Sequence, residues 1–206
     1  MKYLTPVLLF FLLATQCAAQ SAEAPASRAD SSRVYTSVEA ALKAETPVFR
    51  LDLSKKRLRK VPEEVFSFTQ LVELRLDRNR LDSLPPELAK LKNLERLTLA
   101  KNRFERFPQA IVNLSKLRHL DLSDNALSRL PDDIHRLRAL EELILWSNMI
   151  GYYPGSLMRM EKLRLVDLLN NEMNAYEQER LHELLPKTEL ILSPPCNCIF
   201  DDDEDP

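Results

Sequence analysis

The chain has 206 residues, the length of one ordinary domain, and 45% of them are hydrophobic, which is enough to build a buried core. Its 29 Lys and Arg residues against 31 Asp and Glu residues give a formal charge of -2, so bulk charge does not indicate a nucleic-acid-binding protein. Only two glycines occur, which excludes glycine-rich phosphate loops and dinucleotide-binding fingerprints. Three cysteines and three histidines leave little material for a metal or nucleophile site, so we expect no metal and no cofactor.

Residues 1–19 have the features of a secretory signal peptide. Lys2 supplies the positive charge, an apolar run follows at residues 7–14, and small residues close the segment where a signal peptidase cuts. This run is too short to cross a bilayer, and no other stretch is long enough for a membrane span. We therefore expect an exported protein that is periplasmic, on the cell surface or extracellular. A lipoprotein signal modified on Cys17 is the alternative, but Gln16 stands where a small residue is normally needed.

The segment that follows is predicted to be a flexible linker over residues 20–35, because it is rich in Ser and Ala and nearly free of large apolar groups. Thr36 and Glu39 then have the spacing of a capping box, which predicts the start of a helix. Residues 36–47 are accordingly expected to form an N-terminal capping helix, which Pro47 ends.

Residues 48–185 divide into six consecutive blocks of 23 residues without an insertion. The second block reads LVELRLDRNRLDSLPPELAKLKN and the third LERLTLAKNRFERFPQAIVNLSK. Every block has Leu or Val at position 4 and Leu at position 6. Two apolar residues separated by one residue indicate a short strand with one buried face. No block can cover its leucines alone, so each needs its neighbours.

Two further block positions carry structural signals. Position 9 holds an asparagine in all blocks but the first, where Lys56 replaces it: Asn79, Asn102, Asn125, Asn148 and Asn171. Because a side-chain amide both donates and accepts, we expect these residues to form a ladder that bonds the backbone of neighbouring blocks. Position 15 is proline in the first five blocks, which predicts short helical or extended return segments.

The pattern LxxLxLxxNxLxxLPxxLxxLxx resembles the leucine-rich repeat family of the 23-residue class. The flanks are similar to those of small exported bacterial members, such as those of Bacteroidota. The resemblance implies an α/β solenoid that is curved, with a parallel β-sheet on its concave face, short returns on its convex face, and usually a protein-binding role. The last block departs from the pattern, with Glu177 at the proline position. We expect a helix there over about residues 175–185, and a C-terminal cap at 186–200 with a strand near 189–191.

Positions 3, 5 and 7 should point away from the core, and in the last two blocks four of these six residues are apolar. We predict a partner-binding surface there, made of Ile144, Trp146, Leu165 and Leu169 beside His119, Asp121, Glu142 and Asp167. A tryptophan in an apolar patch rimmed by charge is typical of an interface hot spot, so a protein partner is expected, and the ring should be mostly exposed. Two alternatives are that the C-terminal cap folds over Leu165 and Leu169, or that Trp146 packs flat on the sheet.

Positions 8 and 10 of the first three blocks form a basic stripe beyond the strands: Lys55, Arg57, Arg78, Arg80, Lys101 and Arg103. Six stacked cations can attract an anionic glycan or surface polymer, which gives an alternative function. The stripe also has acidic neighbours, and a solvated charged face is the simpler interpretation. No aromatic residue is interleaved for base stacking, so no nucleic-acid partner is predicted.

We predict no enzyme activity. His119, Asp121 and Ser123 superficially resemble a catalytic triad, but such trios arise by chance at outward positions two residues apart, and no oxyanion-hole loop accompanies them. A structural envelope component without a specific ligand is the third functional possibility.

The C-terminal segment contains Cys196 and Cys198, the two cysteines that remain after signal cleavage. An exported chain meets oxidising conditions, so a disulfide between them is expected, with free, intermolecular or metal-bound thiolates as alternatives. Residues 201–206 are expected to be a solvated acidic tail.

Overall fold

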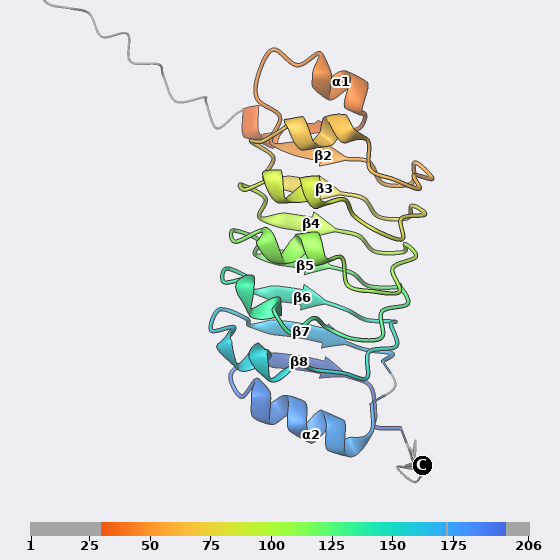
Figure 1. Cartoon of the computed structure of the whole chain (residues 1–206), viewed down its shortest axis with the longest axis vertical. Helices are drawn as coiled ribbons and strands as arrows, with labels where there is room; N and C mark the ends of the chain where they lie inside the picture. The colour runs from red at the N-terminus through yellow and green to blue at the C-terminus, as the bar shows by residue number, and fades with distance from the viewer. Residues whose placement is uncertain (1–29, 172, 197–206) are drawn as a thin grey trace, which may run out of the picture.

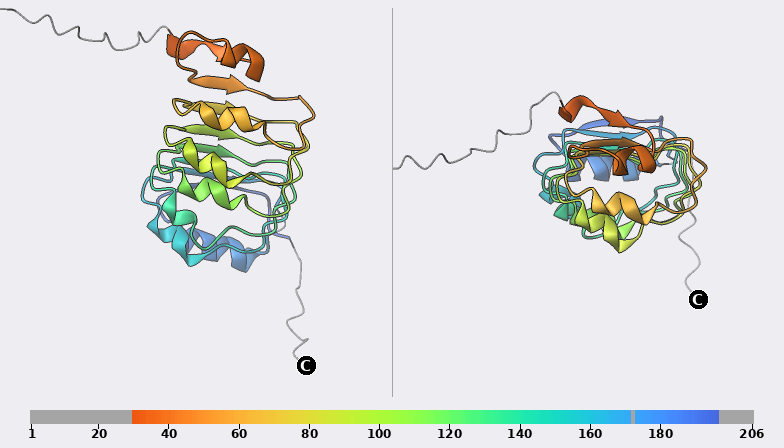
Figure 2. Two further views of the ribbon diagram at one scale, coloured as in Figure 1. Left: turned by 45° about the horizontal axis from the view of Figure 1, so that its top comes forward. Right: turned by 90° about the horizontal axis from the view of Figure 1, so that it is seen from above.

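The computed structural model describes residues 30–171 and 173–196. Each block contributes one strand, a turn, and a return segment that leads to the next strand (Figure 1). The strands form one side of the molecule and the short helices line the opposite side (Figure 2). The α/β repeat architecture predicted from the sequence is confirmed.

Eight parallel strands form one sheet in chain order. They are β1 (Val34–Tyr35), β2 (Arg50–Asp52), β3 (Glu73–Arg75), β4 (Arg96–Thr98), β5 (His119–Asp121), β6 (Glu142–Ile144), β7 (Leu165–Leu168) and β8 (Glu189–Leu192). From β2 to β7 the register follows the repeat, so that Leu51 pairs with Leu74 and Leu74 with Leu97. Equivalent side chains of successive blocks therefore lie in straight rows across the sheet.

The core is built from the same block positions in every turn. All leucines and the single valine at positions 4 and 6 are at most 3% exposed. Full burial of a leucine side chain stabilises a fold by about 1.5–3 kcal/mol, and here that burial depends on the blocks on either side. The stack is therefore one continuous core without an internal boundary.

The return segments are short 3-10 helices. They are η2 (Glu63–Ser67), η3 (Pro86–Lys90), η4 (Gln109–Asn113), η5 (Ile134–Arg136) and η6 (Gly155–Arg159). All except η5 begin directly after the proline at position 15, whose carbonyl accepts a bond from three residues on, as in Val65 N to Pro62 O at 3.1 Å. The predicted helical returns are confirmed.

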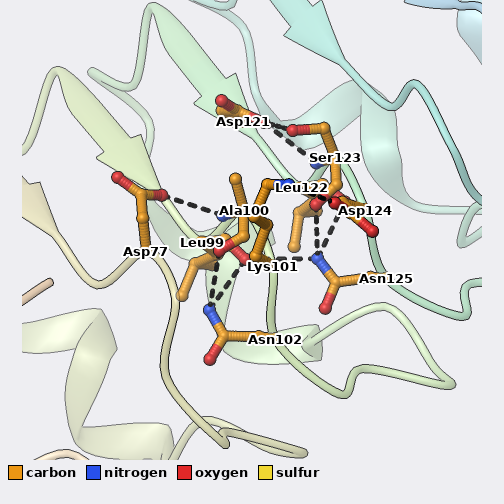
Figure 3. Close-up of polar contacts among 10 residues, drawn as sticks. All are labelled: Asp77, Leu99, Ala100, Lys101, Asn102, Asp121, Leu122, Ser123, Asp124 and Asn125. Atoms are coloured by element: carbon orange, nitrogen blue, oxygen red, sulfur yellow. Dashed lines mark hydrogen bonds and ion pairs between the residues drawn. The ribbon is translucent and has the colours of Figure 1, made fainter. Parts of the chain in front are cut away.

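The predicted asparagine ladder is present and joins consecutive blocks (Figure 3). Asn102 Nδ2 donates to Leu76 O at 3.0 Å and to Leu99 O at 2.9 Å, and its Oδ1 accepts from Leu81 N at 3.1 Å. Asn125 makes the same three kinds of bond one block later. Each amide thus donates to one carbonyl of its own block and one of the preceding block, and it accepts from a backbone N–H of the preceding block.

Position 8, just before the ladder asparagine, has a left-handed backbone in every block. The residues there have φ between 54° and 61°: Lys55, Arg78, Lys101, Asp124, Ser147 and Asn170. In this conformation the N–H of one block reaches a carbonyl of the next, as in Lys55 N to Asp77 O at 2.9 Å. The left-handed region costs a residue with a side chain about 1–2 kcal/mol and is usually given to Gly, Asn or Asp.

The N-terminal end differs from the prediction in two ways. The predicted linker extended to residue 35, but the chain forms η1 (Asp30–Ser32) and then β1, in which Tyr35 is buried against the sheet. The helix α1 (Val38–Leu42) is capped by Ser37, whose hydroxyl accepts from Ala40 N at 3.1 Å. The predicted capping box at Thr36 is therefore wrong, because the helix begins one residue later.

The C-terminal end closes the stack as expected. The helix α2 (Ala175–Leu184) begins with a reciprocal capping box between Asn174 and Glu177, and β8 then continues the sheet beside β7. The predicted signal peptide at 1–19, residues 20–29 of the linker and the acidic tail at 201–206 lie outside the described residues. Within the described ranges no helix combines the length and apolar character needed to span a membrane.

Candidate functional site

The outer sheet face, formed by side chains at block positions 3, 5 and 7, points away from the core. Its N-terminal rows neutralise their own charges. Glu73 is 8% exposed and accepts from Arg75 at 2.6 Å, and Arg50 lies 3.5 Å from the same carboxylate. Three of the six charged side chains in these rows are thus joined in ion pairs.

Asp77 on this face is bonded within the sheet. Its carboxylate accepts from Thr98 Oγ1 at 2.7 Å. It also accepts from Ala100 N at 2.9 Å (Figure 3). Burial raises the pKa of Asp77, and the charges of Asp121 and Asp52 act in the same direction, although the two hydrogen bonds lower it. The net shift is upward because the effect of burial outweighs that of the two hydrogen bonds.

The C-terminal rows of the outer sheet face are apolar. Ile144, Trp146 and Leu165 are half-buried, and Leu169 is 38% exposed. β8 extends the sheet in register beside β7, so the part of the cap that the structure describes does not fold over Leu165 and Leu169.

Ile191 of β8 joins these residues, because it pairs with Asp167 in the next row and is half-buried on the same face. Ile191 is not among the predicted partner-binding residues. The alternation of Glu189, Leu190 and Ile191 indicates it, because the cap strand continues the pattern of inward and outward side chains. We call the five residues Ile144, Trp146, Leu165, Leu169 and Ile191 the apolar patch.

Trp146 is less exposed than predicted. Its ring is half-buried, and the ammonium of Lys101 lies 5.9 Å from the ring centroid. Lys101 is held there by an ion pair with Asp124 at 2.8 Å. The expectation of a mostly exposed ring is therefore wrong, because a side chain from two blocks earlier lies over it. Such a contact between a cation and an aromatic face contributes about 0.5–1 kcal/mol at a partly exposed site.

Acidic residues surround the apolar patch. Asp121 and Asp167 flank Ile144 in the register, and Glu142 and Glu189 flank Leu165. Asp121 accepts from Ser123 N and Ser123 Oγ, and Asp167 accepts from Leu169 N at 3.0 Å. Among the described residues, neither aspartate has a Lys or Arg within ion-pair distance. The rim is therefore anionic.

His119 and Ser123 belong to separate pairs on this rim. His119 Nδ1 lies 2.7 Å from Glu142 Oε2, and this bond lowers the pKa of Glu142. The Ser123 hydroxyl instead donates to Asp121 at 2.6 Å. The three residues that superficially resemble a triad thus form no relay from serine through histidine to aspartate.

The family comparison fits this geometry. The leucine rich repeat family model matches residues 48–104, 69–127 and 92–150, which together span half of the chain. The chain belongs to the leucine-rich repeat family. Proteins of this family generally mediate protein–protein interactions and generally act as non-catalytic scaffolds.

Two solved leucine-rich repeat structures resemble this one. A leucine-rich repeat protein of Leptospira interrogans aligns over 80% of this chain and 49% of its own, with 28% identity and a TM-score of 0.65. The plant peptide hormone receptor RGFR1 in complex with RGF2 aligns over 69% of this chain and 24% of its own, with 30% identity and a TM-score of 0.56. Both support the repeat solenoid, and the Leptospira protein is consistent with the predicted bacterial resemblance.

Curated sequences match shorter parts of the repeat region. Leucine-rich repeat-containing protein 10 of Bos taurus is 54% identical over 52 residues, which are 25% of this chain and 19% of that protein. Leucine-rich repeat protein SHOC-2 of Danio rerio is 40% identical over 70 residues, which are 34% of this chain and 12% of that protein. The matched region thus spans a fifth or less of these relatives.

The basic stripe of this leucine-rich repeat protein lies on the edge where the strands end. All six side chains are exposed, and Lys101 pairs with Asp124. Arg57 shares the left-handed backbone of position 8, with φ of 59°. This extra left-handed residue occurs in the block where Lys56 replaces the ladder asparagine.

The predicted cysteine pair is only partly within the described residues. Cys196 N donates to Met173 O at 2.9 Å, which fixes the chain after β8 against the last block. Cys198 lies outside the described residues, so the disulfide stays a prediction. Among residues 30–171 and 173–196, no group of three or more His, Cys, Asp or Glu is placed to hold a metal ion.

Proposed function

We propose that this leucine-rich repeat protein is a non-catalytic binding module that holds a segment of a partner protein on the apolar patch. The observation that carries the proposal is the grouping of five apolar side chains from three neighbouring rows of the sheet, Trp146 among them, on a face that is otherwise mostly polar. Family membership supports a protein partner. The related plant receptor structure is a complex with RGF2, which supports the same class of function for this chain.

The rim defines the chemistry of the partner segment. Asp121, Asp167 and Glu189 add negative charge around the apolar side chains without a Lys or Arg partner among the described residues. An apolar segment that also carries Lys or Arg complements both features. Because Asp121 and Asp167 are oriented by bonds to the sheet backbone, they can accept hydrogen bonds from a partner without a large loss of side-chain entropy.

Panning of a random peptide display library on the purified protein tests this proposal and does not require the partner to be identified first. Enriched peptides should combine apolar and cationic residues. Trp146→Ala should weaken their binding by about 2 kcal/mol or more, roughly thirtyfold. Tyr176→Ala is the matched control, because Tyr176 is 71% exposed on α2, away from the patch, and its loss should leave affinity unchanged.

Two results would contradict the proposal: enriched peptides that are acidic, or equal effects of Trp146→Ala and Tyr176→Ala. Folding must be measured alongside, since Trp146 is half-buried and its truncation should lower the free energy of unfolding by about 1–3 kcal/mol. Trp146→Phe, which keeps an aromatic ring, separates the loss of affinity from the loss of folding stability. It should retain most of the stability and recover part of the affinity.

We also propose that the protein is exported, on the basis of its N-terminal sequence. Mass spectrometry of the protein from its native host should give a chain that lacks residues 1–19. An intact Met1 or a lipid on Cys17 would contradict this. Alkylation without reduction in the same experiment reports on Cys196 and Cys198, which should resist the reagent if they are bonded.

A further inference from the structure

Positive charge is concentrated in three consecutive turns of the solenoid. The turns at residues 55–60, 78–83 and 101–106 contain ten Lys and Arg and two acidic residues, a formal charge of +8 in a chain whose total is -2. The equivalent turns at 124–129, 147–152 and 170–175 contain one Arg and two acidic residues, a formal charge of -1. The same structural element is therefore strongly basic in the first half of the stack and nearly neutral in the second.

The three turns form one surface. The backbone ladder continues through them, with Lys55 N bonded to Asp77 O at 2.9 Å and Arg78 N to Ala100 O at 2.8 Å. Successive turns are therefore about 5 Å apart, the spacing of neighbouring strands. Figure 1 shows these turns one above another on the edge where the strand arrows end. The cations at positions 8 and 10 thus make two parallel rows along the axis of the stack.

Little of this charge is neutralised within the protein. Of the ten cations, only Lys101 has an ion pair among the described residues, with Asp124 of the following block. Two nearby acidic residues are bonded to other groups: Asp82 accepts from the Ser83 hydroxyl, and Asp77 accepts from Thr98 and Ala100. Like charges about 5 Å apart repel each other, and a bound polyanion would remove that repulsion.

The backbone gives a second, independent reason to assign this edge a function. Lys55, Arg57, Arg78 and Lys101 all have left-handed backbones, which long side chains adopt only with strain. Later blocks use Asp124, Ser147 and Asn170 at position 8, of which the aspartate and the asparagine tolerate this conformation better. The left-handed backbone occurs in every block, so it follows from the repeat, but backbone preference does not explain why the first three blocks have long cationic side chains there.

We propose that this basic edge binds a linear polysaccharide that carries sulfate or phosphate groups. Six of the ten cations are arginines, whose planar guanidinium groups bind such anions with paired hydrogen bonds. Phe104, the aromatic residue of these turns, is buried, as is Phe107 directly after them, so neither ring is available for the base stacking that single-stranded nucleic acids use. Leu81 is buried as well, which leaves no large exposed apolar side chain in the second and third turns to insert into a lipid surface.

This surface is separate from the apolar patch. The basic edge belongs to blocks one to three, and the patch to β6, β7 and β8. The two proposals can therefore fail independently, and each has its own variants. Lys101 is the exception, because it belongs to the edge and also lies over Trp146.

The test measures binding of the full chain to dextran sulfate, with uncharged dextran as the negative probe. Dextran sulfate should bind and uncharged dextran should not, and the affinity should fall steeply between about 50 and 200 mM salt, as counterion release requires. A triple variant, Arg57→Gln, Arg80→Gln and Arg103→Gln, should weaken binding at least about tenfold. It should also reduce the slope of log affinity against log salt concentration by about three, one for each cation removed. It leaves Lys101 unchanged so that the ring of Trp146 stays covered.

The control is a second triple variant with the same change in net charge, Arg138→Gln, Arg159→Gln and Arg180→Gln. These arginines are exposed on return segments and the cap, away from the basic edge, and this variant should bind dextran sulfate like the wild type. Trp146→Ala should also bind it normally, so failure here is distinguishable from failure of the patch. Equal losses in both triple variants would overturn the proposal, because net charge alone would then explain binding. Tighter binding to a single-stranded oligonucleotide than to dextran sulfate would overturn it in favour of a nucleic-acid site.

Discussion

The asparagine ladder offers the sharpest test of how the blocks are held together. In the described residues, the Leu81 N–H has Asn102 Oδ1 as its acceptor, whereas the carbonyls of Leu76 and Leu99 each accept from a second ladder asparagine as well. Asn102→Ala therefore leaves one backbone donor, Leu81 N–H, without its acceptor. It also removes the bonds from Asn102 Nδ2 to Leu76 O and Leu99 O and a longer one to Ala100 O at 3.4 Å, but each of these carbonyls keeps another donor. With about 1–3 kcal/mol for the unpaired group and about 0.5 kcal/mol for each shared bond, the free energy of unfolding should fall by about 2–4 kcal/mol.

The end of the ladder should be more sensitive than its interior. Because Lys56 stands at the asparagine position of the first block, Asn79 is the one ladder asparagine among the described residues that bonds the backbone of that block. Its Oδ1 accepts from both Lys56 N and Leu58 N at 3.0 Å, and its Nδ2 donates to Leu53 O at 2.9 Å. These three backbone groups share no other ladder amide, so Asn79→Ala should cost at least about 1 kcal/mol more than Asn102→Ala.

Urea unfolding followed by far-ultraviolet circular dichroism measures these losses, provided that the slope with urea concentration is unchanged. Asn93→Ala is the matched control: Asn93 bonds Thr69 O and Lys116 Nζ at the surface, where water replaces the amide, and its loss should cost less than about 0.5 kcal/mol. Equal losses in all three variants would refute the structural role of the ladder. A larger loss at Asn102 than at Asn79 would refute the reasoning about its end.

Three further predictions concern individual positions. Burial raises the pKa of Asp77, so its contribution to stability is greatest below the ordinary aspartate pKa and is lost as pH rises through the raised value. As the pH is raised from acid to neutral, Asp77→Asn should therefore gain stability relative to the wild type. Urea unfolding at several pH values measures this difference. Ser147 has φ of 56°, so Ser147→Gly should change stability by less than about 1 kcal/mol while Ser147→Val lowers it by about 1–2 kcal/mol, measured by thermal unfolding. Lys101→Ala should red-shift the fluorescence of Trp146, the single tryptophan, and increase its quenching by acrylamide, and an unchanged spectrum would contradict the contact seen over the ring.

Much of the fold follows from the repeat because one period fixes several contacts at once. When Leu74 and Leu97 occupy the same block position, their strands must pair in that register, and the ladder asparagines must lie one above another. The helix cap at the N-terminus could not be predicted in this way. Thr36 and Ser37 both have a hydroxyl suited to capping, and the structure uses Ser37, a choice that the repeat period does not specify.

The candidate site was predictable in position but not in detail. The alternation of inward and outward residues correctly grouped Ile144, Leu165 and Leu169, since strand geometry decides which face each side chain occupies. The exposure of Trp146 depended on Lys101, which lies 45 residues earlier and reaches the ring only because of the stacking of the turns. Side-chain reach between blocks is set by rotamers and ion pairs, which a repeat pattern does not specify.

The repeat also explains how one small protein can present two unlike surfaces. Positions 4, 6 and 9 are committed to the core and the ladder in nearly every block, whereas positions 3, 5, 7, 8 and 10 lie outside the leucine core and differ in residue type from block to block. Since each block contacts chiefly its neighbours, a change of charge at the edge of block one does not disturb the face of block five. Basic residues at position 8 strain only their own turn, and the buried leucines beneath are unaffected. A solenoid of this kind can therefore acquire a basic edge and an apolar patch separately, and the Arg57 and Trp146 variants should remain additive in stability.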